Sequence, residues 1–321
     1  MKMLLLIALL GANLGSAVAV DVAQQAEMMK KHVAPNTITY KNENTWLYSK
    51  NELEHLAKGE LANGKITAVS SSKKPANADP VPALKSFHND LAELGIKLIL
   101  LPVPPKLAAV PCGKLKINDA MCYLKPFYQE LRKQGLTVID ISEHFNNNGS
   151  SYYCKTDAHW SPAGIALAVD LLTKEIPLRG KTTFSTSVSQ QQIAGDLARS
   201  LNKQSPETEN ITIQSVSGEP INANSQVLLL GDSHTLIFSA GADMLAEKSG
   251  LAELLAVKLN MPIDRIGVRG SAATAVRINL FRKAAKDLGW LKNKKYVIYC
   301  FSSREFTEAT SGWTVVPVVK K

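Results

Sequence analysis

Short apolar runs recur along the chain and alternate with longer amphipathic stretches. The runs have the length of strands and are rich in aliphatic residues, as in parallel strands that are covered on both faces. They lie at residues 97–103, 136–141, 227–230, 265–268 and 296–301. Helical spacing of apolar residues is found at residues 83–94, 122–133 and 272–288. This alternation predicts an α/β fold in which a mainly parallel sheet lies between two layers of helices.

Two polar stretches interrupt the alternation. Residues 70–82 are rich in serine, lysine, proline and alanine, which predicts an exposed loop. Residues 179–224 are long, polar and rich in glutamine, serine and threonine. A connection of this length predicts an insertion at the active site or a small pair of strands.

The first residues have the pattern of an export signal. Lys2 is followed by an apolar run at residues 4–10, and residues 17–19 form a small-x-small cleavage site. We therefore predict a signal peptide at residues 1–19 and a periplasmic protein, with an uncleaved inner-membrane anchor as the alternative. Residues 20–321 are predicted to form a single catalytic domain, because a mature length of roughly 300 residues suits one large α/β domain.

The apolar run at residues 227–230 leads directly into Gly231-Asp232-Ser233-His234. Spaced apolar residues at 235–245 predict a following helix, which places Ser233 on a tight strand-to-helix turn. There its hydroxyl is exposed at the carboxyl edge of the sheet, and backbone N–H groups can hold an oxyanion. The alternative is that Asp232 and Ser233 only cap the helix.

A second motif, Asp157-Ala158-His159-Trp160, stands before Ser161-Pro162, which has the pattern of a helix start. Asp157 and His159 are separated by one residue, so in extended backbone they project the same way and can meet. The alternative is a loop histidine buried beside Trp160.

The two motifs together supply a nucleophile, a base and an acid. A serine hydroxyl becomes a good nucleophile when a histidine takes its proton, and that histidine needs a carboxylate to orient it. We therefore predict a triad of Ser233, His159 and Asp157. His234 is expected to line or cap the site, because neighbouring side chains at a helix start diverge. No histidine has the spacing of a metal ligand relative to cysteines or carboxylates, so neither a metal nor another cofactor is predicted.

With these motifs the chain resembles the SGNH-hydrolase-like family of alginate O-acetyltransferases, of the AlgJ and AlgX type. The resemblance runs from about Asn44 to Phe306, and as in the family the DxH pair precedes the serine. Besides the triad it includes an early tryptophan-containing strand, a V-P-P-K element, a T-D-x-H-W motif and a G-D-L element, found at residues 44–48, 103–106, 156–160 and 195–197.

The resemblance implies an SGNH-hydrolase-like three-layer fold with Ser233 as nucleophile, His159 as base and Asp157 as orienting acid. Gly270, after Arg269, resembles the glycine of a loop that contributes an oxyanion donor. Two positions depart from the family pattern. Cys300 stands where the family often has a glutamate, and His234 stands where an aromatic residue is commoner, so the departures concern substrate identity. In layout the chain is closer to AlgJ, since no room remains for the carbohydrate-binding module of AlgX.

Four cysteines fit an oxidising compartment. Cys112 and Cys122 flank a short polar loop and are expected to pair. A Cys154–Cys300 disulfide is expected if both line the same site, where it would stiffen the triad loop against the sheet. A reduced, reactive Cys154 is the alternative.

The formal net charge of +9 indicates anionic partners, although solubility alone also accounts for such a charge. Lys106, Arg269 and Arg304 are the basic residues expected nearest the cleft, with internal ion pairs as the alternative; Trp160 and His234 are further candidates for substrate contact. Export and the lack of a nucleic-acid-binding motif argue against nucleic acid.

The resemblance implies an anionic exopolysaccharide, alginate or a similar polymer, as the substrate, and a membrane-bound O-acyltransferase as the source of acetyl groups. The predicted function is an exported O-acetyltransferase that works through an acetyl-serine intermediate. One alternative is an SGNH-type carbohydrate acetyl esterase, which uses water as acceptor. Another is a non-catalytic polysaccharide-binding subunit of an acetylation complex.

Overall fold

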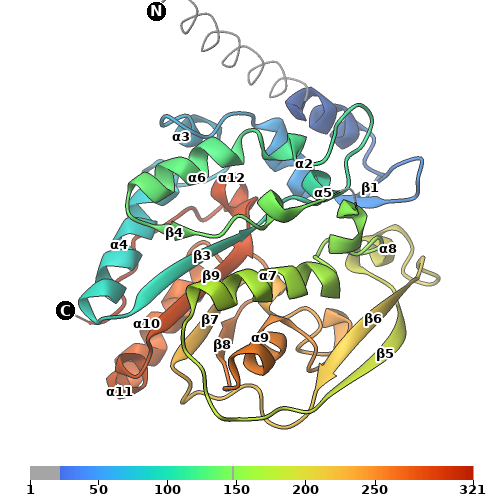
Figure 1. The fold of residues 1–321 in the computed structure, drawn as a ribbon. Helices are drawn as coiled ribbons and strands as arrows, with labels where there is room; N and C mark the ends of the chain where they lie inside the picture. The colour runs from blue at the N-terminus through green and yellow to red at the C-terminus, as the bar shows by residue number, and fades with distance from the viewer. Residues whose placement is uncertain (1–21, 147, 321) are drawn as a thin grey trace, which may run out of the picture.

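A five-stranded parallel sheet forms the centre of the molecule (Figure 1). The computed structural model describes residues 22–146 and 148–320, so the predicted signal peptide lies outside the described residues. The strands are β3 (Lys97–Val103), β4 (Thr137–Val138), β7 (Val227–Gly231), β8 (Asp264–Gly267) and β9 (Tyr296–Ser302). Their order is β4-β3-β9-β7-β8, and every neighbouring pair is parallel. The predicted α/β fold with a parallel sheet is confirmed.

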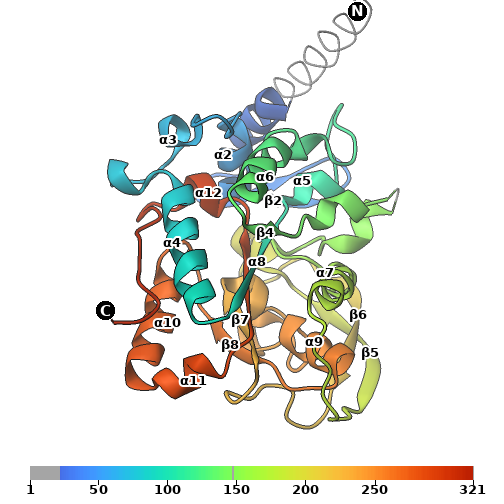
Figure 2. The same cartoon turned by 60° about the vertical axis from the view of Figure 1, so that its left-hand side comes forward.

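Helices cover both faces of this sheet. Figure 2 shows α4 (Pro80–Glu93) and α10 (Ala275–Lys286) on one side and α7 (Pro162–Glu175) and α9 (Leu251–Leu259) on the other. Further helices include α2 (Lys50–Ala57), α3 (Ile66–Val69), α5 (Lys106–Ala109), α6 (Leu124–Lys133), α8 (Asp196–Leu201), α11 (Leu288–Lys292) and α12 (Glu305–Glu308), and residues 22–31 are also helical. None of the helices in the described ranges is long and apolar enough to cross a bilayer.

The central strands are buried on both faces, which explains their unbroken apolar sequences. Every residue of β7 is buried, and so are all residues of β3 and β9 except the first of each. In register, Ile298 of β9 lies between Ile99 of β3 and Leu229 of β7. The sheet is therefore a rigid platform, and the loops at its carboxyl edge are positioned by it.

The long polar stretch contains a small antiparallel pair of strands, as predicted. These are β5 (Thr186–Ile193) and β6 (Glu209–Val216), and α8 lies in the connection between them. A second small pair, β1 (Thr39–Lys41) and β2 (Leu47–Ser49), includes the predicted early strand. Residues 70–82 are mostly exposed or half-buried, and α4 begins within them at Pro80, with Asp79 as its N-cap.

The helix predicted at residues 235–245 does not form, and this prediction is wrong. After β7 the chain makes one short 3₁₀ turn, Ser233–Thr235, and later a second, Ala242–Met244. Phe238 and Leu245 have φ angles of 58° and 72°, which a right-handed helix does not contain. Ser233 therefore lies on a tight turn after a central strand, as predicted, but no α-helix follows it.

Candidate active site

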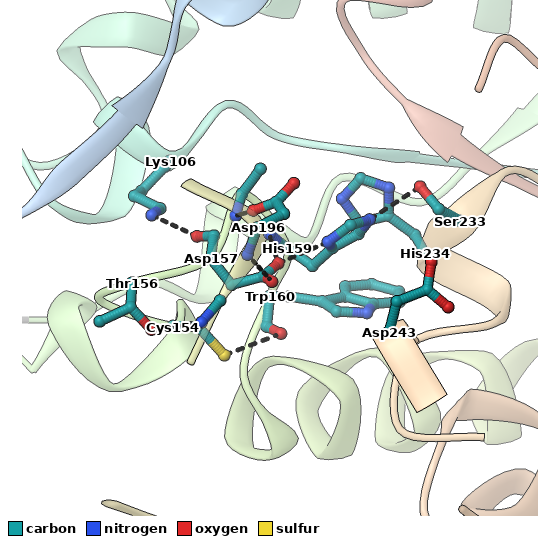
Figure 3. A network of polar contacts seen from close by, with 12 residues as sticks. Lys106, Cys154, Thr156, Asp157, His159, Trp160, Asp196, Ser233, His234 and Asp243 are labelled. Carbon is teal, nitrogen blue, oxygen red and sulfur yellow. Dashed lines mark hydrogen bonds and ion pairs between the residues drawn. The ribbon is translucent and has the colours of Figure 1, made fainter. Parts of the chain in front are cut away.

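The structure brings the three residues of the predicted triad together (Figure 3). Nε2 of His159 lies 2.7 Å from Oγ of Ser233, and Nδ1 of His159 lies 2.6 Å from Oδ1 of Asp157. Ser233 comes from the turn after β7, whereas Asp157 and His159 lie in the loop before α7. All three side chains are largely buried, so water competes little with these hydrogen bonds. The arrangement is a continuous hydrogen-bonded chain from carboxylate to hydroxyl.

The start of α8 holds the carboxylate of Asp157. Oδ1 of Asp157 accepts a hydrogen bond from the backbone N–H of His159 at 2.9 Å, and Oδ2 accepts one from the N–H of Asp196 at 2.8 Å. In return, Oδ1 of Asp196 accepts from the N–H of Ala158 at 2.8 Å. Asp157 is thus fixed in the orientation that aims its Oδ1 at the imidazole.

Glu209, at the start of β6, supports the same loop from outside. Its Oε1 accepts from the N–H and the hydroxyl of Thr156 at 2.7 and 2.6 Å, and its Oε2 accepts from the N–H of Lys155 at 2.8 Å. Gly195 allows the two segments to approach, since a Cβ there would overlap the carbonyl of Thr156. The insertion that contains β5, α8 and β6 therefore supports the triad loop.

The pKa shifts show how protons are placed in the triad. Burial alone would raise the pKa of Asp157, but the charge and hydrogen bond of His159 outweigh it and lower that pKa below its usual range. Burial alone would lower the pKa of His159, but Asp157 outweighs it and raises that pKa. Asp157 is therefore ionised at neutral pH and keeps a proton on Nδ1 of His159. Nε2 is then free to accept the proton of Ser233, which is the activation that acyl transfer requires.

Asp232 organises the turn that carries Ser233. Its Oδ1 accepts from the backbone N–H of His234 at 2.9 Å and from the His234 ring nitrogen Nδ1 at 3.0 Å. Its Oδ2 accepts from the N–H of Ser302, at the end of β9, at 2.7 Å. Burial raises the pKa of Asp232, but His234 and the hydrogen bonds outweigh it and lower that pKa to about 2. The aspartate is thus an ionised clamp between β9 and the Ser233 turn.

His234 and Trp160 border the triad. The ring centroids of His234 and His159 are 4.7 Å apart, and the Trp160 ring meets His234 edge to face at 5.6 Å. Trp160 is fully buried. Gly270 lies on an exposed turn after β8 with a φ angle of 83°, a conformation that suits glycine.

The three basic residues predicted near the cleft have different surroundings. Lys106 is fully buried, and its Nζ donates to the carbonyls of Leu47 and Asp157 at 2.7 and 2.5 Å. It therefore lies behind the triad loop and does not face a substrate (Figure 3). Arg269 is exposed and forms a bidentate ion pair with Asp243 at 2.6 and 2.8 Å. Arg304 is half-buried.

Lys106 is expected to be essential for the stability of this loop. Lys106→Met leaves two carbonyls unpaired and removes the charge that opposes buried Glu52. Breaking such a buried interaction costs about 3–5 kcal/mol, or a fall in Tm of roughly 6–20 °C. Thermal unfolding measures it, with exposed Lys114→Met as the control. A change in Tm no larger than that of the control would contradict this role.

The predicted disulfides are not present. All four cysteines, Cys112, Cys122, Cys154 and Cys300, are free thiols. The Cys154 thiol donates to the carbonyl of Trp160 at 3.6 Å, whereas Cys300 lies within β9 in the middle of the sheet. Burial raises the pKa of both thiols well above the usual value, which also argues against the alternative of a reactive Cys154.

One cluster of potential metal ligands occurs among the described residues. Ligand atoms of Asp157, His159 and Asp196 lie within 4.8 Å of one another. Hydrogen bonds of the triad loop and α8 already use both oxygens of Asp157, Oδ1 of Asp196 and Nδ1 of His159. The chemistry of this cluster is thus that of a proton-holding network.

Sequence reasoning offered Asp232 as a cap, which it is for the 3₁₀ turn, but missed its contact with β9 and the roles of Asp196 and Glu209. Asp196 had a signal, because it belongs to the G-D-L element, and Asp232 is adjacent to the serine. Glu209 had none, since its contact with Thr156 depends on how β5 and β6 fold back.

The sheet, the serine after its inner strand β7 and the earlier DxH pair together define an SGNH-hydrolase-like domain. The family model described as "SGNH hydrolase-like domain, acetyltransferase AlgX" matches residues 41–286. The chain therefore belongs to this acetyltransferase family, and the resemblance noted in the sequence is confirmed.

Two solved structures show the same fold. The O-acetyltransferase domain of Pseudomonas putida AlgJ matches with a TM-score of 0.61 and 16% identity, over 84% of this chain and 92% of that chain. Pseudomonas aeruginosa AlgX matches with a TM-score of 0.57 and 17% identity, over 83% of this chain and 63% of that chain. A search of curated protein sequences gives no match. At these identities the structural matches establish the fold alone.

Proposed function

We propose that this protein is an exported O-acetyltransferase that carries an acetyl group on Ser233 and transfers it to a hydroxyl of an anionic exopolysaccharide such as alginate. The observation that carries the proposal is the hydrogen-bonded chain from Asp157 through His159 to Ser233. Membership of an acetyltransferase family makes acetyl the group to be transferred.

In the first half-reaction, Oγ of Ser233 attacks the carbonyl carbon of an acetyl ester while Nε2 of His159 takes its proton. The imidazolium, stabilised by Asp157, then gives that proton to the departing oxygen of the donor. In the second half-reaction, a sugar hydroxyl gives its proton to His159 and attacks the acetyl carbon. Oγ of Ser233 leaves and regains the proton, so the enzyme is restored. The backbone N–H of Ser233 and the loop at Gly270 are the oxyanion donors we propose.

Charge supports an anionic acceptor. The chain has a net charge of +9. Arg199, in α8, donates to the carbonyl of Asp243 at 3.3 Å, and Arg269 pairs with the carboxylate of the same residue. Arg199 lies on α8, which also carries Asp196, whereas Arg269 lies in the turn after β8 and is linked to Arg199 through Asp243. A membrane-bound O-acyltransferase is the partner that we propose supplies acetyl groups, with export to the periplasm.

The fate of the acetyl group tests the proposal. Purified protein is given a chromogenic acetyl ester with an oligouronate or a neutral oligosaccharide of equal length. We expect acetylated oligouronate by mass spectrometry, and little from the neutral acceptor. Free acetate without acetylated sugar would make the protein an esterase. The lack of any reaction above the uncatalysed rate would favour a binding subunit.

As the pH is lowered, the activity is expected to begin to fall at a pH above 6.5, which is the ordinary pKa of histidine. His159 must be unprotonated to accept the serine proton, and its pKa is raised by Asp157, Asp196 and Asp232. Protonation therefore removes the base as the pH falls through this raised value. The profile of kcat/KM against pH measures it, with circular dichroism at each pH to show that the fold persists. An acid limb below pH 6.5 would contradict the assigned electrostatics.

A further inference from the structure

A second aspartate–histidine pair lies beside the triad and has no part in the mechanism above. We propose that His234 is a specificity-determining residue that accepts a hydrogen bond from a second hydroxyl of the acceptor, so that the preferred acceptor is a vicinal diol. This inference rests on the proposed function and deepens it.

The tautomer of His234 follows from Asp232. The carboxylate of Asp232 is held by the N–H of Ser302 and by the N–H of His234 itself, and its lowered pKa keeps it ionised. An ionised carboxylate 3.0 Å from Nδ1 of His234 fixes the ring proton on that nitrogen. Nε2 of His234 is thereby an unprotonated acceptor.

The charge state of the ring agrees with this role. Burial lowers the pKa of His234, and the opposing charge of Asp232 does not overcome it. The ring is consequently neutral when the neighbouring His159 becomes charged during the reaction. Because His234 stays neutral, the protonation of His159 does not place two positively charged imidazolium rings side by side.

Nε2 of His234 is available to a ligand. Within the described residues, the ring bonds to the protein through Nδ1 alone, and Nε2 is not among the buried polar atoms left without a partner. Ser233, His159 and His234 retain 8, 7 and 3% exposure, so each of the three keeps a small exposed surface. The buried Trp160 ring packs edge to face against His234 and helps to fix its orientation.

The spacing of the two imidazoles indicates what binds there. Their centroids are 4.7 Å apart, and one of them bonds to the serine that would carry the acetyl group. The attacking hydroxyl must donate to His159. A second unprotonated nitrogen beside it needs another O–H donor, which a carboxylate of the polymer cannot supply at neutral pH. Hydroxyls on adjacent ring carbons supply both donors at once.

Small alcohols as acceptors can distinguish recognition of a second hydroxyl by His234 from a purely structural role of this residue. A chromogenic acetyl ester is the donor, and cyclohexane-1,2-diol, cyclohexane-1,3-diol and cyclohexanol are the acceptors. The burst of chromophore reports acylation of Ser233, and kcat/KM for each acceptor reports recognition. Both diols have two hydroxyls that can be acetylated, so comparing them with each other removes the twofold statistical advantage over cyclohexanol. We expect the native protein to prefer the 1,2-diol roughly 3- to 12-fold, the value of one hydrogen bond.

Two variants assign the preference to His234. His234→Phe keeps a ring against His159 but offers no acceptor, so the ratio of kcat/KM for the two diols, each taken per acylated Ser233 from the burst, should fall to about one. His234→Gln can still accept and should retain part of the preference. A normal burst without any preference in the native protein would overturn the inference and leave the proposed function standing. If both variants lost the burst equally, the role of His234 would be to hold Ser233 in place, and the inference about the acceptor would again be overturned. No burst in the native protein would overturn both.

Discussion

Exchange of Ser233 for alanine is expected to lower acetyl transfer by roughly 10⁴- to 10⁶-fold, the range found when the nucleophile of a serine hydrolase is removed. The reason is that no other hydroxyl in the described site lies at 2.7 Å from Nε2 of His159. Alanine removes one oxygen from a side chain that is 8% exposed, so the fold should persist. Steady-state turnover of a chromogenic acetyl ester measures the effect.

The matched control is Ser189→Ala on the exposed strand β5, which should keep native turnover. Thermal unfolding of both variants shows whether the fold is intact. Turnover of Ser233→Ala within tenfold of the native value, in a protein with native Tm, would rule out Ser233 as nucleophile.

Asp157→Asn is expected to lower kcat by about 10⁴-fold, as the same exchange does in serine proteases. Asparagine has nearly the same shape and can still accept from the N–H of Asp196, so the loop should be retained. It has no negative charge to stabilise the imidazolium, and its amide group no longer enforces the proton on Nδ1 of His159. The pKa of His159 should also fall, because its largest favourable partner is lost.

Asp170→Asn is the control for this exchange. Asp170 lies on the exposed side of α7, and its carboxylate pairs with exposed Lys258 at 2.8 Å. Its exchange should leave kcat and the acid limb of the pH profile unchanged. If Asp157→Asn kept kcat within tenfold of native with an unshifted acid limb, Asp157 would not be the orienting acid.

Local sequence patterns were sufficient to predict the strands and helices whose apolar residues form the core. The aliphatic run at 227–230 became β7, and the Ser161-Pro162 start became the beginning of α7, where Oγ of Ser161 accepts from two backbone N–H groups. Both signals are local, since they depend on burial of a strand and on unpaired N–H groups at a helix start.

The failures have tertiary causes. Residues 235–245 have helical apolar spacing, but Phe238 is fully buried with a left-handed backbone, which packing imposes and spacing does not reveal. The predicted strand at 136–141 is reduced to Thr137–Val138, because Asp140 caps a 3₁₀ helix that begins at Ile141. The disulfides were inferred from loop positions, whereas pairing depends on three-dimensional proximity.

The supports of the triad also lay beyond sequence reasoning. Asp196 and Glu209 reach the Thr156–Asp157 segment from positions 39 and 53 residues later in the chain. Only the pairing of β5 with β6 brings both to one loop. The three residues that meet in the hydrogen-bonded chain were therefore predictable from their types and order, but those that hold them were not.

The most direct test of the account is to find the acetyl group on the protein. Native protein is mixed with a chromogenic acetyl ester, quenched in acid and mapped by peptide mass spectrometry, with and without a chase of oligouronate. The account predicts one acetyl group on Ser233 that the chase removes as acetylated sugar. Turnover that continues while Ser233 stays unmodified, or an acetyl group on another residue that the chase removes, would contradict it.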